Sequence, residues 1–278
     1  MARFLDPGMF EAEVDLPPPE RLTPLEFIMR EAIAQPRPSG ALPLAFVNAD
    51  LAPSSPWRSK LGAAERLVRS QALSENILFD LYTERQAAAS GGIWNRVEAI
   101  QAFDVALLAG NRKAIAASLP VAYQAMQEVA LEVPFARRYG DRLAMFDLDG
   151  PARTTAFRVA MLSDGFEDAA ARFSPEDPRD IFVRGLAAGA IGGLEPPGNL
   201  GSAISRAFLQ PMPEGPLRDL LAAGQLGEAI LRAMLLLKGE AFGDPGDITA
   251  ALSVFRAVGL EYEARRIAIQ LLLLERRG

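Results

Sequence analysis

The sequence contains no cysteine and no histidine among its 278 residues. These absences exclude disulfides, thiol nucleophiles, the usual zinc ligands and every mechanism in which an imidazole carries a proton. Any catalysis would depend on carboxylates, tyrosine, lysine or serine. We therefore expect no metal and no cofactor, and the composition favours a binding function over an enzymatic one.

Lysine is also scarce, because only three lysines occur among 29 basic residues. This bias toward arginine, together with abundant alanine, is typical of a GC-rich bacterial genome. The net charge of −6 opposes nonspecific binding to nucleic acid or to anionic lipid, since both need an excess of positive charge at the contact. We expect no nucleic-acid partner.

Long apolar runs are missing as well. The strongest run, residues 267–274, is far shorter than the roughly 20 residues of a membrane-spanning helix, so no membrane insertion is expected. The first residues lack the apolar core of a signal peptide, and residues 1–22 form an acidic, proline-containing segment typical of an extended linker. We expect an upstream signal or domain before residue 1, with a periplasmic location in that case and a cytoplasmic one otherwise.

Small polar residues before proline predict helix starts, because the side-chain oxygen caps the helix and proline needs no N–H at the first helical position. This pattern occurs at Thr23-Pro24, Ser55-Pro56, Asp177-Pro178 and Asp244-Pro245. Further candidate N-caps are Ser74, Asn111 and Asn199, and candidate left-handed C-caps are Gly110, Gly224 and Gly259. The chain is thus predicted to consist of roughly a dozen short helices.

Apolar residues between these caps follow helical spacing. Two predicted buried faces are Leu61, Ala64, Leu67 and Val68, and Val97, Ile100, Phe103 and Leu107. The segment 42–51 admits a strand, but its alanines and flanking helices favour a buried helix or an extended connector. The predicted fold class is all-α, built from stacked helical hairpins in an α-solenoid or superhelix.

An internal echo with a spacing of 35 residues occurs near the C-terminus. The matching pairs are Ala222/Ala257, Gly224/Gly259, Glu228/Glu263, Ala229/Ala264, Ala233/Ala268, Leu236/Leu271 and Leu237/Leu272. Each copy predicts a helix that ends at glycine and a second helix with small alanines on its packing face. This pattern resembles the tetratricopeptide-like helical repeats, whose period is about 34 residues. In general character the chain is also similar to helical-repeat proteins of α-proteobacteria.

Breaks rich in glycine and proline predict the domain organisation. After the linker-like residues 1–22 we expect an N-terminal helical array over 23–190, a Gly/Pro-rich connector over 191–213 and two C-terminal hairpins over 214–278. The last two parts also fit one continuous domain with the array. The resemblance to helical repeats implies a groove that binds a protein or peptide.

The segment 82–96 carries the main candidate site. Its Ser-Gly-Gly turn precedes a predicted helix, whose free N–H groups suit an anion or a carbonyl. The candidate ligand-binding residues are Tyr82, Arg85, Ser90, Gly91, Gly92, Trp94 and Arg96. Trp94 offers a ring for stacking on a sugar or peptide, and Glu84 is the candidate catalytic acid or base. The alternative is a structural turn in which Trp94 fills the core.

Three other segments have plainer interpretations. Residues 147–150 begin like a calcium loop but lack its later acidic ligands, so a turn and helix stop is expected. The basic segment 137–142 is expected to be a solvated helix face with local ion pairs. The glycine-rich stretch 185–201 lacks the motifs of a phosphate-binding loop.

Three functions remain open at this stage. The first is a non-catalytic interaction scaffold that presents a helical groove to a protein or peptide partner. The second is a glycan-acting helical enzyme or accessory domain of a cell-envelope protein, with Glu84 as the acid. The third is a structural spacer. The sequence does not determine the oligomeric state.

Overall fold

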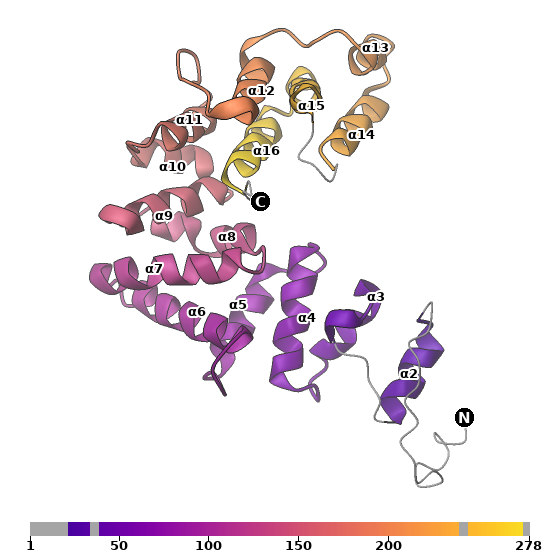
Figure 1. Ribbon diagram of the computed structural model, residues 1–278, viewed down its shortest axis with the longest axis vertical. Helices are drawn as coiled ribbons and strands as arrows, with labels where there is room; N and C mark the ends of the chain where they lie inside the picture. The colour runs from indigo at the N-terminus through magenta and orange to yellow at the C-terminus, as the bar shows by residue number, and fades with distance from the viewer. Residues whose placement is uncertain (1–21, 34–38, 239–243, 275–278) are drawn as a thin grey trace. The chain divides into compact units, whose positions relative to one another are not determined.

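The computed structural model describes residues 22–33, 39–238 and 244–274, and every regular element within these residues is a helix (Figure 1). This confirms the all-α fold class. Residues 1–21 of the predicted linker lie outside the described residues. The chain divides into two compact units, residues 1–101 and 102–278, with the boundary inside helix α6 (Ile93–Leu108). No helix in the described ranges is long and apolar enough to cross a membrane.

The first unit contains six elements before α6. Their bounds are α2 (Pro24–Ala32), η2 (Ser39–Ala41), α3 (Leu44–Val47), η3 (Asn48–Leu51), α4 (Trp57–Arg69) and α5 (Glu75–Glu84). Helix α4 packs against α3, η3 and α5, and its predicted apolar face, from Leu61 to Val68, is buried. The segment 42–51 is helical, as expected from its composition.

The second unit continues as a series of helices that pack in pairs. Their bounds are α7 (Arg112–Gln127), α8 (Glu132–Leu143), α9 (Gly150–Leu162), α10 (Phe166–Arg172), α11 (Pro178–Ala187), α12 (Gly198–Leu209), α13 (Pro216–Ala222), α14 (Leu226–Leu236), α15 (Pro245–Ala257) and α16 (Glu261–Leu273). Helix α9 contacts α7, α8 and α10, whereas α15 lies among α12, α14 and α16 (Figure 1). This helix-on-helix packing agrees with stacked helical hairpins.

Most of the predicted helix starts are confirmed. Thr23, Ser74, Asn111, Asp177 and Asp244 each accept a hydrogen bond from a backbone N–H in the first turn of their helix. Two predictions are wrong. Pro56, not Ser55, occupies the N-cap position of α4, and Asn199 lies inside α12, which begins at Gly198. In both cases a proline, Pro56 or Pro197, occupies the N-cap position, and no side chain caps the helix.

The predicted glycine C-caps adopt one common turn. Gly110, Gly224 and Gly259 have φ values of 62°, 74° and 84°. In each turn the glycine N–H donates three residues back and the following N–H donates five residues back, as in a Schellman motif. Gln71 and Ala130 form the same turn with φ values of 59° and 55°, although neither is a glycine.

The two C-terminal hairpins share the position of their turns, although α13 has 7 residues and α15 has 13. Helices α13 and α15 end at Ala222 and Ala257, and α14 and α16 begin four residues after those ends. The small residues on their packing faces are fully buried, as predicted: Ala229, Ala233, Ala264 and Ala268. Small side chains let the helices approach closely, and α15 fills the space between them.

Helix α16 is joined to earlier helices of the second unit through charged side chains. Arg265 pairs with Glu167 and donates to the backbone carbonyl of Ala187, and Arg266 pairs with Asp164 at 2.8 Å. The ring of Tyr262 lies 5.0 Å from the ring of Phe166. These contacts bind the last hairpin to α10 and α11.

The turn predicted at residues 147–150 is present, because residues 147–149 are non-helical and separate α8 from α9, which begins at Gly150. Two other sequence predictions need correction. The predicted connector 191–213 contains helix α12, because prolines at 196 and 197 start a helix here. The basic segment 137–142 is not wholly solvated, because Tyr139 is buried against Phe103 and Phe135.

Candidate functional site

A cleft of about 1230 Å³ opens in the first unit, beside the N-terminal half of α4. One wall is formed by the segment 54–65, which includes the start of α4. The other wall is the turn 89–92 with the first residues of α6. Single residues of α2, η2 and η3 complete the lining, which consists of Glu31, Gly40, Asp50, Ser54, Ser55, Pro56, Arg58, Ser59, Gly62, Glu65, Ala89, Ser90, Gly91, Gly92, Ile93, Trp94 and Arg96.

The turn on this wall requires its two glycines for conformational reasons. Gly91 and Gly92 have φ values of 90° and 54°, a region that other residues rarely adopt. The N–H of Gly91 donates to Oδ1 of Asn95 at 2.7 Å, which closes the turn onto the first turn of α6. A Cβ atom at either glycine would meet no atom within 4 Å, so the cleft side of this turn is open.

A buried polar network lies at the inner side of the cleft. Oε1 of Glu65 accepts hydrogen bonds from the Tyr82 hydroxyl at 2.7 Å and from Nε of Arg96 at 2.9 Å. Oε2 of Glu65 accepts a further bond from Arg96 at 2.9 Å. Burial, followed by the negative charge of Glu65, raises the pKa of Tyr82 well above its usual value. The network therefore joins α4, α5 and α6 through a neutral phenol and a bidentate ion pair.

Trp94 lines the cleft, and Trp57, the other tryptophan of the chain, packs against Trp94. The rings of Trp57 and Trp94 are 5.2 Å apart and tilted by 44°. Nε1 of Trp57 donates a hydrogen bond of 3.1 Å to the carbonyl of Leu81, which holds this ring against α5. Trp94 lines the cleft and is partly exposed, so it combines a packing role with an accessible ring edge.

Most of the residues predicted from the sequence converge on this cleft. Ser90, Gly91, Gly92, Trp94 and Arg96 line it. Tyr82 lies behind it and contacts it only through Glu65. Glu84 and Arg85 are not in its lining. They form an exposed ion pair with each other at 3.0 Å.

Several lining residues carried no recognisable signal in the sequence. Ser54, Arg58 and Ser59 come from the start of α4, about 35 residues before the turn that they face. Their side chains form no hydrogen bond or ion pair within the described part of the chain. A cation and two hydroxyls are thus available on this wall.

Carboxylates also line the cleft. Partial burial and then the nearby charge of Asp50 raise the pKa of Glu31. Glu31 and Asp50 both line the cleft, whose other acid, Glu65, is neutralised by Arg96. The cleft therefore offers positive charge at Arg58 and negative charge at Glu31, whereas Asp50 already has a partner.

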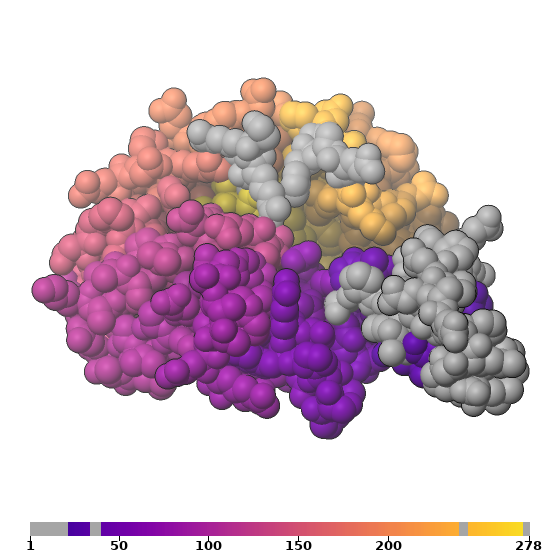
Figure 2. All heavy atoms as spheres, turned by 60° about the horizontal axis from the view of Figure 1, so that its bottom comes forward, coloured from indigo at the N-terminus to yellow at the C-terminus, as the bar shows by residue number. Residues whose placement is uncertain are grey.

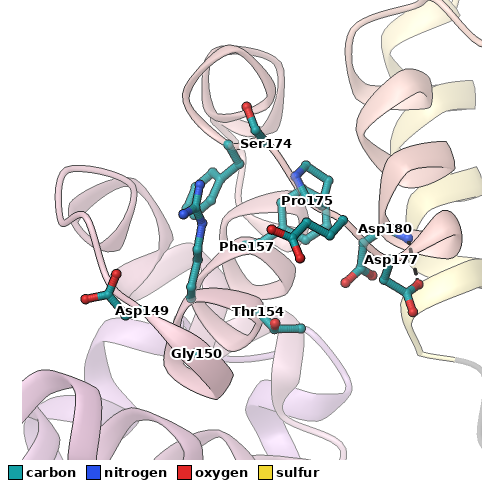
Figure 3. Close-up of a pocket in the computed structure, with 11 residues that line it drawn as sticks. Asp149, Gly150, Thr154, Phe157, Ser174, Pro175, Asp177 and Asp180 are labelled. Atoms are coloured by element: carbon teal, nitrogen blue, oxygen red, sulfur yellow. Dashed lines mark hydrogen bonds between the residues drawn. The ribbon is translucent and has the colours of Figure 1, made fainter.

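A smaller pocket of about 430 Å³ lies in the second unit, between the start of α9 and the segment that leads into α11 (Figure 3). Its inner side is aromatic, with Phe157 and Phe173 in edge-to-face contact at 5.7 Å. Asp177 and Asp180 lie together at one end, and Asp149 lies at the other (Figure 3). Asp149 is paired with Arg112 at 3.0 Å. This acid of the segment 147–150, which begins like a calcium loop, therefore already has a cationic partner.

Asp180 is the most buried acid of this pocket. Its side chain is 2% exposed and pairs with Arg158 at 3.3 Å. Burial raises the pKa of Asp180 in spite of Arg158, which acts in the opposite direction. Because the carboxylate already has this partner, Asp180 has a structural role: its ion pair with Arg158 connects α11 to α9.

Comparisons with known proteins identify no relative for this chain. No family model matches the sequence, and neither a curated protein nor a solved structure matches it.

Proposed function

We propose that this protein is a non-catalytic interaction scaffold, and that the cleft of the first unit binds a peptide segment of a protein partner. The observation that carries the proposal is the convergence of five residues of the predicted binding segment, Trp94 among them, on one open cleft together with Arg58. Peptide sites commonly combine an aromatic contact with a few directed polar groups.

The polar groups of the cleft suit a peptide. Hydroxyls of Ser54, Ser59 and Ser90 offer both donors and acceptors to a peptide backbone. Arg58 and the partly buried Glu31, which both line the cleft, favour a segment that carries charges of both signs. This charge arrangement also opposes a uniformly acidic ligand.

The engagement of Glu65 supports binding over catalysis. A general base needs an oxygen that is available to a substrate proton. The oxygens of Glu65 already accept three hydrogen bonds from Tyr82 and Arg96, which hold the helices together. Glu84, the acid considered from the sequence, pairs with Arg85 outside the cleft lining.

The test begins with a displayed library of random peptides, selected on the whole chain. Selected peptides are then titrated while tryptophan fluorescence is recorded, because one of the two tryptophans of the chain, Trp94, lines the cleft and the other contacts Trp94. We expect saturable binding that weakens several-fold in Arg58→Ala and in Ser90→Trp, which fills the open turn. Lys113→Ala on α7, an exposed change in the second unit, is the matched control and should bind normally.

Equal binding of the selected peptides by wild type, Arg58→Ala and Ser90→Trp would contradict the cleft as the peptide site. Oligosaccharides are titrated in the same assay. A fluorescence change with a glycan and with no selected peptide would favour the glycan-acting alternative. If neither class of ligand bound, a structural spacer would be the better interpretation.

A further inference from the structure

Helix α14 carries an aliphatic stripe that no other helix of the second unit covers. Leu231, Met234 and Leu235 are 54–58% exposed. The opposite face of α14, at Ala229 and Ala233, is fully buried against α15. Positions 227, 231, 234 and 235 lie on one side of the helix, so Leu231, Met234 and Leu235 form a continuous apolar surface beside Gly227. Atoms in the orange-gold of this region lie at the surface in the space-filling view (Figure 2).

The equivalent face of α16 shows what such a surface does in this fold. With the 35-residue spacing, Gly227, Leu231 and Met234 correspond to Tyr262, Arg266 and Ile269. Ile269 is fully buried, Arg266 pairs with Asp164, and Tyr262 packs on Phe166. The same helix face is therefore docked against neighbouring helices in one hairpin and bare in the other. Edge helices of stacked hairpins normally present a polar outer face.

A glycine within the stripe is not explained by packing inside the chain. Gly227 is helical and exposed, and a Cβ atom added there would meet no atom within 4 Å. Gly227 is the second residue of α14, and it leaves this end of the stripe without a side chain. A glycine on a helix surface permits the close approach of a second helix.

The stripe is complementary to itself in an antiparallel arrangement. If two α14 helices cross with their Leu231 side chains at the two-fold axis, Leu235 of each copy lies over Gly227 of the other, because both positions are four residues from the centre. Glu228 and Arg232 occupy one flank of the stripe and pair within the helix at 2.6 Å. In an antiparallel pair the same flanks meet, so Glu228 of one copy lies on the same flank as Arg232 of the other, offset by about 3 Å along the helix axis, within reach of the long arginine side chain.

We propose that two copies of this chain associate through α14, antiparallel and centred on Leu231, with crossed pairs between Glu228 and Arg232. The exposed stripe is smaller than the roughly 800 Å² per partner of a standard interface. The dimer is therefore weak and depends on protein concentration. This association is independent of the peptide cleft in the first unit.

The first experiment is sedimentation equilibrium of the whole chain over a wide concentration series. Wild type should shift from monomer to dimer, and Leu231→Arg should remain monomeric with an unchanged circular dichroism spectrum, since the side chain is exposed. Val121→Arg on α7 places the same charge on another exposed apolar position and should still dimerise. A monomer at all wild-type concentrations would overturn the proposal, as would an equal loss of dimer in Val121→Arg.

Charge exchange tests the antiparallel register. E228R and R232E each place like charges on the flank, so each variant alone should dimerise more weakly than wild type. Their mixture should recover association, because the flanks of the two variants are then oppositely charged. Failure of the mixture to recover would contradict the crossed pairs between Glu228 and Arg232.

Single-cysteine variants give an independent readout, because the chain has no cysteine of its own. Leu231→Cys lies at the proposed two-fold axis and should form a disulfide between copies under mild oxidation. Gly227→Cys faces position 235 of the other copy and should crosslink far more slowly. Faster crosslinking of Gly227→Cys than of Leu231→Cys would overturn the antiparallel arrangement.

Discussion

The hydroxyl of Tyr82 donates a hydrogen bond of 2.7 Å to Oε1 of Glu65, and both side chains are buried. Tyr82 belongs to α5 and Glu65 to α4, while Arg96 on α6 completes the network. Three helices of the first unit thus meet at one carboxylate. Since α4 and α6 also form the walls of the cleft, the geometry of the cleft depends on this network.

Removal of either partner from this network should destabilise the protein unequally. Tyr82→Phe removes one donor and should reduce the free energy of unfolding by about 1–3 kcal/mol, because one oxygen of Glu65 loses a partner. Glu65→Ala leaves the partly buried Arg96 unpaired and should cost more, about 3–5 kcal/mol. Urea unfolding measures both.

Glu84→Gln is the control for this pair of variants. Glu84 is exposed and pairs only with the exposed Arg85, so its change should stay within about 0.5 kcal/mol of wild type. A Tyr82→Phe variant as stable as the Glu84→Gln variant would contradict a structural role for the Tyr82 hydroxyl.

The glycine turns allow a prediction with opposite signs at two positions. Ala130 and Gly110 both occupy the left-handed position of a Schellman turn in the second unit, with φ values of 55° and 62°. Ala130→Gly should therefore stabilise the protein by up to about 1 kcal/mol, and Gly110→Ala should destabilise it by about 1 kcal/mol or more. Thermal unfolding measures both changes. A loss of stability in Ala130→Gly would show that chain entropy outweighs backbone strain at this turn.

These turns also show why much of the fold could be predicted. A helix end at Gly110, Gly224 or Gly259 depends on local geometry that glycine alone adopts without strain, so the residue type reveals the structure. The equivalent ends at Gln71 and Ala130 carry no such signal. There the surrounding helices impose the left-handed conformation on residues that do not favour it.

The candidate site was only partly predictable for a related reason. Ser90, Gly91 and Trp94 are neighbours in sequence, so their combination was visible as a local pattern. Arg58 and Asp50 reach the cleft through packing of α4 and η3, which no local pattern encodes. Tertiary packing also explains the arginines of α16. Arg265 and Arg266 pair with Glu167 and Asp164, which lie about 100 residues earlier in the sequence.

Asp180 predicts a pH dependence of stability. Burial raises its pKa above the ordinary value of about 3.9, so the folded state holds this proton more tightly than the unfolded state does. The resulting stabilisation is present below the ordinary pKa and is lost as the pH rises through the raised pKa. Asp180→Asn lacks this step, so its stability relative to wild type should increase as the pH rises from about 4 toward neutrality.

Urea unfolding at a series of pH values measures this difference. Asp168→Asn, an exposed change on α10, is the control, and its difference from wild type should not follow the same step. Parallel stability curves for wild type and Asp180→Asn would contradict a raised pKa at Asp180.

Two helical glycines give the last prediction, because they differ in what surrounds them. A Cβ atom at Gly140 on α8 would lie 2.6 Å from Cβ of Ser163 and 3.2 Å from the carbonyl oxygen of Val159. A Cβ atom at Gly62 on α4 would meet nothing within 4 Å. Alanine improves helix propensity by about 1 kcal/mol at both positions, but at Gly140 it must also separate α8 from α9.

Overpacking of this kind costs about 1–3 kcal/mol, which exceeds the gain in propensity. Gly140→Ala should therefore lower the melting temperature, whereas Gly62→Ala should raise it. Both variants are measured by calorimetry under identical conditions. A stabilised Gly140→Ala variant would mean that α8 and α9 separate at little cost, and the close packing of these two helices would then not be a source of stability for the second unit.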